Sequence, residues 1–127
     1  DFPNYNYVIP NTHKTKVRIN KDKLLQATKR AALLARQNTD IIKLNFKAEG
    51  LIITANATEV GNVYERLDIS FSGEEVKIAF NANYLMECLK VIEEEEIIIN
   101  LFDELSPGVI KTDSGEYTYV IMPVRSA

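Results

Sequence analysis

An internal repeat restricts the fold of this 127-residue chain more than any other feature of its sequence. Residues 16–20 (KVRIN) have a counterpart 61 positions later in residues 77–81 (KIAFN). Residues 50–54 (GLIIT) have a similar counterpart in residues 108–112 (GVIKT). Repetition on this scale indicates that one supersecondary unit occurs twice, which limits the chain to architectures with internal symmetry.

Each unit reads as a strand, a helix and three further strands. Alternating apolar and polar residues predict the strands, and apolar residues three or four positions apart predict the helices, the first of them capped by Asn20. The predicted strands are 15–20, 41–48, 51–57 and 62–72 around a helix at 21–36, then 77–81, 97–102, 108–113 and 117–124 around a helix at 83–94. Two βαβββ units predict an α+β domain with two four-stranded antiparallel sheets and both helices on one side.

Composition argues against several classes of function. A net charge of -3 and a pI of about 5.2 argue against a surface that is basic throughout. The single cysteine, Cys88, excludes an internal disulfide, which fits a reducing, cytoplasmic setting. Its alignment with Ala27 in the repeat predicts a core position. No apolar run reaches the roughly 18 to 20 residues of a membrane span.

Nothing in the sequence indicates catalysis. His13 has no second ligand or nucleophile near it, and the four carboxylates of residues 93–96 read as a solvated run that helps to end a helix. We therefore expect no metal, no cofactor and no catalytic residue.

The start of the chain differs from the repeats. Residues 1–14 contain Pro3 and Pro10 among asparagines and aromatic residues, which predicts a linker that packs across a surface. A folded domain is expected at 15–127. The chain begins at Asp1 without an initiator methionine, so we expect it to be processed or to be part of a longer protein.

The end of the chain carries an unusual strand. Residues 117–121 are β-branched and aromatic, and Pro123 then ends the strand because proline has no N–H to donate within a sheet. The apolar residues around this proline either complete the core or form a patch that another molecule covers.

Three separated motifs resemble those of one known family. Residues 2–10 (FPNYNYVIP), 80–85 (FNANYL) and 119–125 (YVIMPVR) are similar to segments of the bacterial DNA polymerase III beta subunit, the replicative sliding clamp. The resemblance covers essentially the whole chain, but only as the third domain of that protein. It implies a DNA-clamp fold within a ring of two head-to-tail protomers, and a non-catalytic processivity factor in DNA replication.

The resemblance also implies half of a peptide-binding groove. Clamp-binding proteins of the family, including the DNA polymerase III alpha and clamp-loader delta subunits, insert a short peptide with a glutamine and a Leu-Phe-like pair. An apolar cleft with a few polar groups suits such a peptide, and a flexible methionine adapts to different side chains. The matching positions are Pro3, Tyr7, Val8, Asn81, Tyr84, Leu105, Pro107, Val120, Ile121, Met122, Pro123, Val124 and Arg125.

Two further surfaces follow from the resemblance. The helices of a clamp face double-stranded DNA, where basic side chains meet phosphates without reading sequence, or the same side chains are simply solvated. Leu33 and Leu34 are expected to contact a second protomer, although Leu34 could instead belong to the core stripe of the helix and an isolated surface leucine at 33 needs no such explanation. The candidates for DNA contact are Lys21, Lys23, Lys29, Arg30 and Lys90.

A different function stays open at this point. An α+β protein-interaction module with the same repeats but no role in replication or DNA binding would use the terminal apolar stretch only for its core. Burial separates the two interpretations, neither of which involves a membrane. The clamp requires an open groove formed by Pro3, Val8, Tyr84 and Met122.

Overall fold

The computed structural model describes residues 14–35, 40–57 and 61–124 of the chain. These residues form two helices and nine strands. In chain order they are β1 (Thr15–Asn20), α2 (Lys21–Ala35), β2 (Ile41–Lys47), β3 (Gly50–Ala57), β4 (Gly61–Leu67), β5 (Ser70–Gly73), β6 (Val76–Asn81), α3 (Ala82–Val91), β7 (Glu96–Leu101), β8 (Gly108–Lys111) and β9 (Thr118–Ile121). β1 and β6 begin 61 positions apart, and so do α2 and α3, as the repeat predicts.

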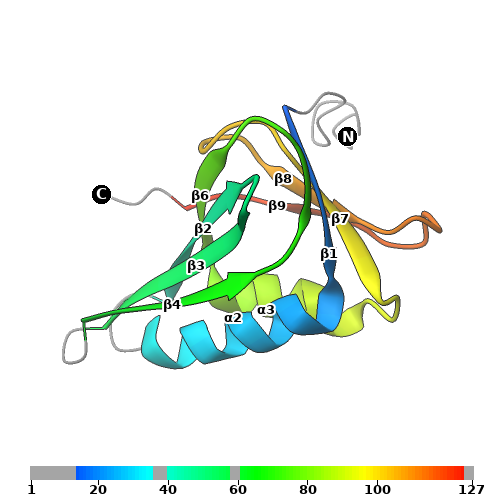
Figure 1. The fold of residues 1–127 in the computed structure, drawn as a ribbon. Helices are drawn as coiled ribbons and strands as arrows, with labels where there is room; N and C mark the ends of the chain where they lie inside the picture. Colours follow the sequence, from blue (N-terminus) through cyan, green and yellow to red (C-terminus); the bar gives the residue numbers. More distant parts are fainter. Residues whose placement is uncertain (1–13, 36–39, 58–60, 125–127) are drawn as a thin grey trace, which may run out of the picture.

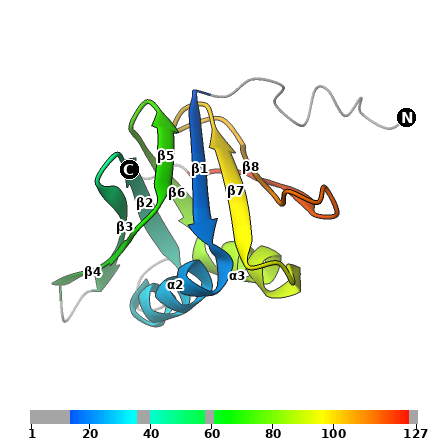
Figure 2. The ribbon, with the colours of Figure 1, turned by 45° about the vertical axis from the view of Figure 1, so that its right-hand side comes forward.

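The strands form two antiparallel sheets, with both helices packed on one side (Figure 1). One sheet has the order β5-β1-β7-β8-β9 and the other the order β4-β3-β2-β6. The helices are in contact and lie side by side across one end of the sheets in both Figure 1 and Figure 2. The predicted α+β class with two antiparallel sheets is therefore confirmed.

One sheet has five strands because the segment predicted as a single strand at 62–72 forms two. β4 ends at Leu67, and the chain then leaves the four-stranded sheet. β5 joins the other sheet, where Phe71 pairs with Val17 of β1. The alternation continues through the crossing, with Leu67, Ile69 and Phe71 all partly buried. Periodicity alone therefore could not show the break.

The two repeat units exchange their first strands. β1, from the first unit, pairs with β7 of the second, with Val17 opposite Ile99. β6, from the second unit, pairs with β2 of the first, with Phe80 opposite Ile42. Each sheet therefore contains strands from both units, and one unit alone cannot complete either sheet.

The hydrophobic core draws on both sheets and both helices. Leu24 of α2, Phe46 of β2, Phe80 of β6 and Leu85 of α3 are each at most 2% exposed. Burying a side chain of this size stabilises a fold by about 1.5–3 kcal/mol. This core fixes the junction between β6 and α3, from which part of the candidate site projects.

The helix α3 ends at Val91, earlier than its predicted end at residue 94. Ile92 has extended backbone, and its N–H donates to the carbonyl oxygen of Leu89 at 3.3 Å. The side chain of Ile92 turns into the core, where it is 1% exposed, and this burial ends the helix before the glutamate run.

Cys88 is half-buried, so its predicted place in the core is wrong. Its counterpart Ala27 is completely buried. On α3 the core-facing positions are taken by Leu85 and Leu89, and Cys88 lies at the margin of that buried side of the helix. Burial, and secondarily the negative charge of Glu87, raises the pKa of the Cys88 thiol.

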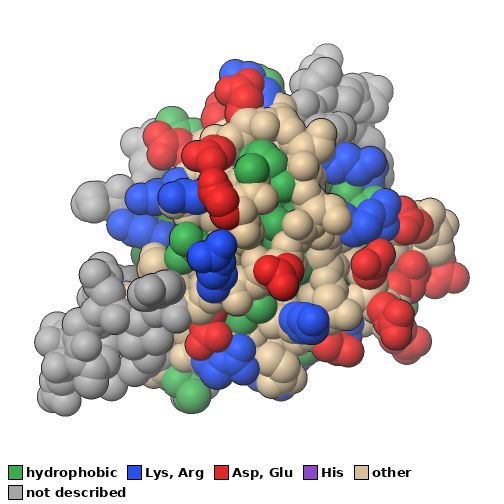
Figure 3. Space-filling model, in the orientation of Figure 1, with side chains coloured by type: hydrophobic (Ala, Val, Ile, Leu, Met, Phe, Trp, Pro, Cys, Tyr) green, Lys and Arg blue, Asp and Glu red, His purple; other side chains and the backbone are tan. Residues whose placement is uncertain are grey.

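Opposite charges gather on different parts of the surface (Figure 3). In this view Lys and Arg side chains gather over β2 and β6 on the left, and Asp and Glu side chains gather at the lower right, with further Lys and Arg side chains above them. The chain has a net charge of -3 and still presents a basic region.

Candidate peptide-binding groove

Asn81 caps the helix α3 and determines where Tyr84 projects. Its side-chain oxygen accepts hydrogen bonds from the N–H groups of Asn83 at 2.9 Å and Tyr84 at 3.3 Å. Such a cap satisfies N–H groups that have no partner inside the helix. Tyr84, in the first turn, is 64% exposed because Leu85 takes the core-facing position beside it.

The C-terminal segment crosses from one sheet to the other. β9 ends at Ile121, which pairs with Gly108 and is 5% exposed. Further along, the N–H of Val124 donates to the carbonyl oxygen of Ala79 at 2.8 Å, on the edge strand β6. Between these anchors Met122 is 64% exposed. The backbone on both sides of Met122 is thus held while its side chain projects outward.

The loop between β7 and β8 presents a third exposed apolar side chain. Asp103 accepts a hydrogen bond from the N–H of Leu105 at 2.9 Å, which closes a turn. Hydrogen bonds from the Ser106 side chain and then from the Leu105 backbone hold the pKa of Asp103 below its usual range. Leu105 is 63% exposed at the tip of this turn.

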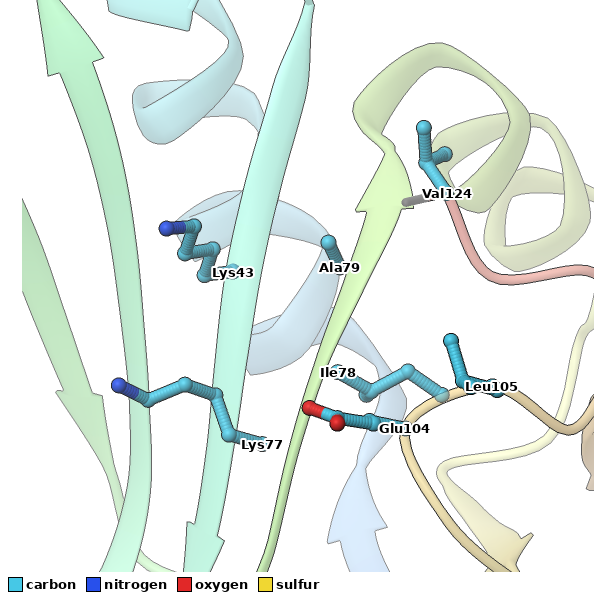
Figure 4. A pocket seen from close by; sticks show the side chains of 7 residues that line it. All are labelled: Lys43, Lys77, Ile78, Ala79, Glu104, Leu105 and Val124. Atoms are coloured by element: carbon cyan, nitrogen blue, oxygen red, sulfur yellow. The ribbon is translucent and has the colours of Figure 1, made fainter. Parts of the chain in front are cut away.

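A pocket of about 330 Å³ lies between this loop, the C-terminal segment and the edge of the four-stranded sheet (Figure 4). Leu105 and Val124 line one side of it. Lys43 and Lys77 line the other side, and their amino groups extend away from the two apolar residues. The pocket therefore joins an apolar wall to a cationic one.

The structure brings part of the predicted set together. Leu105 and Val124 share the pocket. Tyr84 is exposed just after β6, and Met122 is exposed just before Val124, which is bonded to β6. Ile121 lies in the hydrophobic core, where it anchors the end of β9.

The other predicted positions are less exposed or outside the described residues. Three are half-buried: Pro107, Val120 and Pro123. Four lie outside the described part of the chain: Pro3, Tyr7, Val8 and Arg125. Of the four side chains that distinguish an open groove from a closed core, Tyr84 and Met122 are described, and both are exposed.

Sequence reasoning missed the residues that line the pocket from the sheet. It predicted the alternation of 41–48 but not which face is buried. The structure buries Ile42, Leu44 and Phe46 and places Lys43 and Lys47 on the outer face. The sequence also could not show that β6 lies at the edge of the four-stranded sheet. Residues of β6 line the pocket only because no further strand in the described part of the chain covers that edge. The missed residues are Lys43, Lys77, Ile78, Ala79 and Glu104.

The helices carry the residues predicted to contact DNA. Lys21 pairs with Asp22 at 2.8 Å, and Arg30 pairs with Glu65 of β4 at 2.9 Å, a hydrogen bond that raises the pKa of Arg30. Within residues 14–35, 40–57 and 61–124, the exposed lysines that take part in no ion pair include Lys23, Lys29 and Lys90.

The predicted subunit contact lies on α2. Leu33 is 62% exposed, which is high for a leucine on a helix that packs against a sheet. The side chain of Leu34 is outside the described residues.

Comparison with known proteins decides the family. The sequence profile described as DNA polymerase III beta subunit, C-terminal domain, matches residues 6–125. The chain belongs to this family. The resemblance seen in three sequence motifs is thereby confirmed, and the comparisons favour a clamp domain over an unrelated interaction module.

Relatives of this beta-subunit domain are beta sliding clamps. The chain is 35% identical over 130 residues to the clamp of Bacillus subtilis, covering 99% of this chain and 34% of that clamp. It is 32% identical over 125 residues to the clamp of Chlamydia pneumoniae, covering 98% of this chain and 34% of that clamp. The chain therefore spans about a third of the length of these relatives.

Solved structures of beta subunits have the same fold. The DNA polymerase III beta subunit of Thermotoga maritima superposes with a TM-score of 0.93 at 33% identity, over 100% of this chain and 35% of that one. A sliding clamp of Bartonella birtlesii, solved bound to griselimycin, gives 0.89 at 27% identity, over 99% of this chain and 34% of that one. The DNA-clamp fold of the chain is thus shown by its sequence and its structure together.

Two further observations concern the described part of this clamp domain. It contains no group of three or more His, Cys, Asp or Glu side chains placed to hold a metal ion. Neither α2 nor α3 is long and apolar enough to cross a membrane.

Proposed function

We propose that this chain is the C-terminal domain of a replicative sliding clamp, a non-catalytic processivity factor that tethers DNA polymerase III to DNA. Its membership of the beta-subunit family and its similarity to clamps over nearly all of its length support this function. Ring closure around DNA needs the other domains of a clamp as well, and the setting proposed is the bacterial cytoplasm.

The observation that carries the proposal is the exposure of Met122 between two anchored neighbours. Ile121 is buried and Val124 is bonded to β6, so the exposure of Met122 is set by the fold. Exposed apolar side chains held in this way indicate a surface that a partner covers. Tyr84 and Leu105 add apolar area, and Asn81 adds a polar group that can orient a peptide.

The proposed ligand is a short peptide with a glutamine and a Leu-Phe-like pair. The proteins that would carry it are the DNA polymerase III alpha subunit, the clamp-loader delta subunit and other clamp-binding proteins. The thioether of Met122 is flexible and polarisable, which suits one site to several apolar side chains. Pro3, Tyr7, Val8 and Arg125 belong to the same proposal by family resemblance. A griselimycin-bound relative supports the presence of a ligand site in this family.

Contact with DNA is proposed for the outer face of the helices. Lys23, Lys29 and Lys90 are exposed cations there, and they suit non-specific contact with the phosphates of a duplex. Lys21 and Arg30 are secondary candidates because their charges are already paired within the domain.

A head-to-tail contact with a second protomer is proposed at Leu33 and Leu34. Burying an exposed leucine in a subunit interface contributes about 1.5–3 kcal/mol. The high exposure of Leu33 supports a contact at this end of α2.

An NMR titration tests the peptide site. The ¹⁵N-labelled chain is titrated with a peptide that contains glutamine followed by a Leu-Phe pair, up to millimolar concentration. We expect saturable shifts at the backbone of 81–84, 105 and 122–124, and much smaller shifts in a Met122→Ala variant. A peptide of the same composition in scrambled order is the control.

The absence of saturable shifts would count against the groove on this domain. Repeating the titration with a preceding clamp domain attached then shows whether that domain supplies the affinity. If the longer protein also fails to bind, the proposed function is wrong.

A further inference from the structure

The outer face of the four-stranded sheet carries four cations. In β2, Ile42, Leu44 and Phe46 are buried, so Lys43, Asn45 and Lys47 point to the opposite face. Cross-strand pairing places Lys77 opposite Asn45, and Arg66 opposite Ile52, which itself pairs with Asn45. Directly paired residues share a face of a sheet. This outer basic face consists of Lys43, Lys47, Arg66 and Lys77.

These cations are not neutralised within the described residues. Ion pairs in that part of the chain involve Arg18, Lys21 and Arg30, and none involves a member of the outer basic face. Arg66 donates a hydrogen bond to the backbone oxygen of Glu49 at 3.2 Å, which leaves its charge uncompensated. Four unpaired cations on one face of a chain with a net charge of -3 make a local site for an anionic partner.

The outer basic face is continuous with the candidate peptide groove. The pocket is lined by Leu105 and Val124 on one side and by Lys43 and Lys77 on the other (Figure 4). Val124 is bonded to Ala79, and Ala79 pairs with Lys43 on the next strand. Neighbouring strands lie about 4.8 Å apart, so Lys43 is roughly 10 Å from the C-terminal segment. An extended peptide covers that distance in about three residues.

We propose that the peptides bound in the groove carry acidic residues about two to four positions from their apolar anchors, and that these residues contact Lys43 and Lys77. This inference rests on the proposed peptide-binding function. An acidic peptide is favoured over a nucleic acid because the two lysines share their pocket with the apolar side chains of Leu105 and Val124. Apolar anchors followed by carboxylates match both walls of the pocket.

Glu104 is expected to weaken the binding of an acidic peptide at the same site. It is the acidic residue among those that line the pocket, and it lies beside Leu105 on the loop. Its carboxylate is within ion-pair distance of neither lysine, so it repels an incoming carboxylate without neutralising the lysines. Removing this charge is expected to strengthen the binding of an acidic peptide.

The test uses peptides that share one Gln and Leu-Phe core. One carries an Asp-Glu pair before the core, one carries the pair after it, and one carries Ser-Asn at both places. Each is titrated into the labelled chain at low and at high salt. We expect one acidic peptide to bind roughly three- to tenfold more tightly than the neutral peptide at low salt. The difference shrinks at high salt because the contacts are exposed.

Charge variants locate the effect. In the Lys43→Gln, Lys77→Gln double variant the acidic and neutral peptides should bind equally, and in Glu104→Gln the preference for the acidic peptide should grow. The matched control is Lys16→Gln, Lys111→Gln, which removes two lysines from the five-stranded sheet and should leave the preference intact.

Three outcomes would overturn the inference. Equal affinity of the neutral and acidic peptides for the unmodified chain refutes it and leaves the peptide groove standing. A preference that survives in the double variant also refutes it. A single-stranded oligonucleotide that binds Lys43 and Lys77 more tightly than the acidic peptide would assign the face to nucleic acid. Failure of every peptide to bind instead overturns the proposed function itself.

Discussion

Gly73 and Gly115 both adopt positive φ, of 111° and 79°, but only at Gly73 does other backbone occupy the place of a side chain. A Cβ at Gly73 would lie 1.9 Å from the carbonyl oxygen of Lys14, whereas a Cβ at Gly115 would meet nothing within 4 Å. A substitution at Gly115 therefore tests backbone strain alone, whereas a substitution at Gly73 tests backbone strain together with steric overlap.

We predict that Gly73→Ala destabilises the chain more than Gly115→Ala. The second variant adds only the strain of a left-handed residue, about 1–2 kcal/mol. The first must also displace β1 from β5, and we expect a loss of at least about 3 kcal/mol. Urea unfolding of both variants measures the difference. Equal losses would mean that the approach of residue 14 to Gly73 can relax without cost.

The ion pair of Arg18 and Asp113 joins β1 to the turn between β8 and β9. Its two contacts measure 2.6 Å and 3.1 Å, and Glu96 lies 3.6 Å from the same guanidinium. The hydrogen bond from Arg18, and then its positive charge, holds the pKa of Asp113 below its usual range. The pair links strands that are distant in sequence through a planar, bidentate geometry.

We predict that Asp113→Asn destabilises the chain at pH 7 and that this effect disappears in acid. A carboxylate with a lowered pKa in the folded state contributes stability above its unfolded pKa, about 3.9. That contribution is lost as the pH falls through the lower, folded pKa. Urea midpoints of both proteins, measured from pH 7 down to pH 2, give the comparison. If the stability difference between the two proteins is as large at pH 2 as at pH 7, the destabilisation by Asp113→Asn does not come from the loss of the carboxylate charge.

The turn at Asp103 offers a prediction for the site. Asp103→Ala removes the acceptor for the Leu105 N–H, so Leu105 should lose its fixed position and peptide affinity should fall roughly two- to fivefold. Asp103→Asn keeps an acceptor oxygen and serves as the matched control. Peptide titrations of both variants measure the effect. Equal affinities would show that the turn does not position Leu105.

The helices and most strands could be predicted from the sequence because their periodicity is local. The alternation in 41–48 predicted β2 to within one residue, and the cap at Asn20 predicted the start of α2. In the structure the Asn20 side chain accepts a hydrogen bond from the Lys23 N–H at 2.9 Å. The crossing from β4 to β5 and the edge position of β6 depend on pairing between distant segments, which periodicity does not encode.

The candidate site was predictable in part for the same reason. Tyr84, Leu105 and Met122 came from resemblance to a family, and their exposure agrees with a binding surface. Lys43 and Lys77 were missed because they join the pocket only through the pairing of β2 with β6.

At the scale of the whole molecule, the exchange of first strands predicts that neither half folds by itself. Residues 1–75 lack β7, the partner of β1, and lack β6, the partner of β2. Residues 76–127 lack β1 and β2. We expect each separate half to give a poorly dispersed amide spectrum, while the intact chain gives a dispersed one. A dispersed spectrum from either half alone would show that its sheet closes without the exchanged strand.

The same exchange has a consequence during synthesis on the ribosome. Val17 and Ile19, at most 2% exposed in the folded chain, pair with Ile99 and Ile97, which are translated much later. Until then the nascent chain carries β1 with one open edge and an apolar face. Strands in that state associate readily with other chains or with chaperones. A pause of the ribosome before β7 is translated therefore prolongs the exposure of this edge and is expected to lower the yield of this protein.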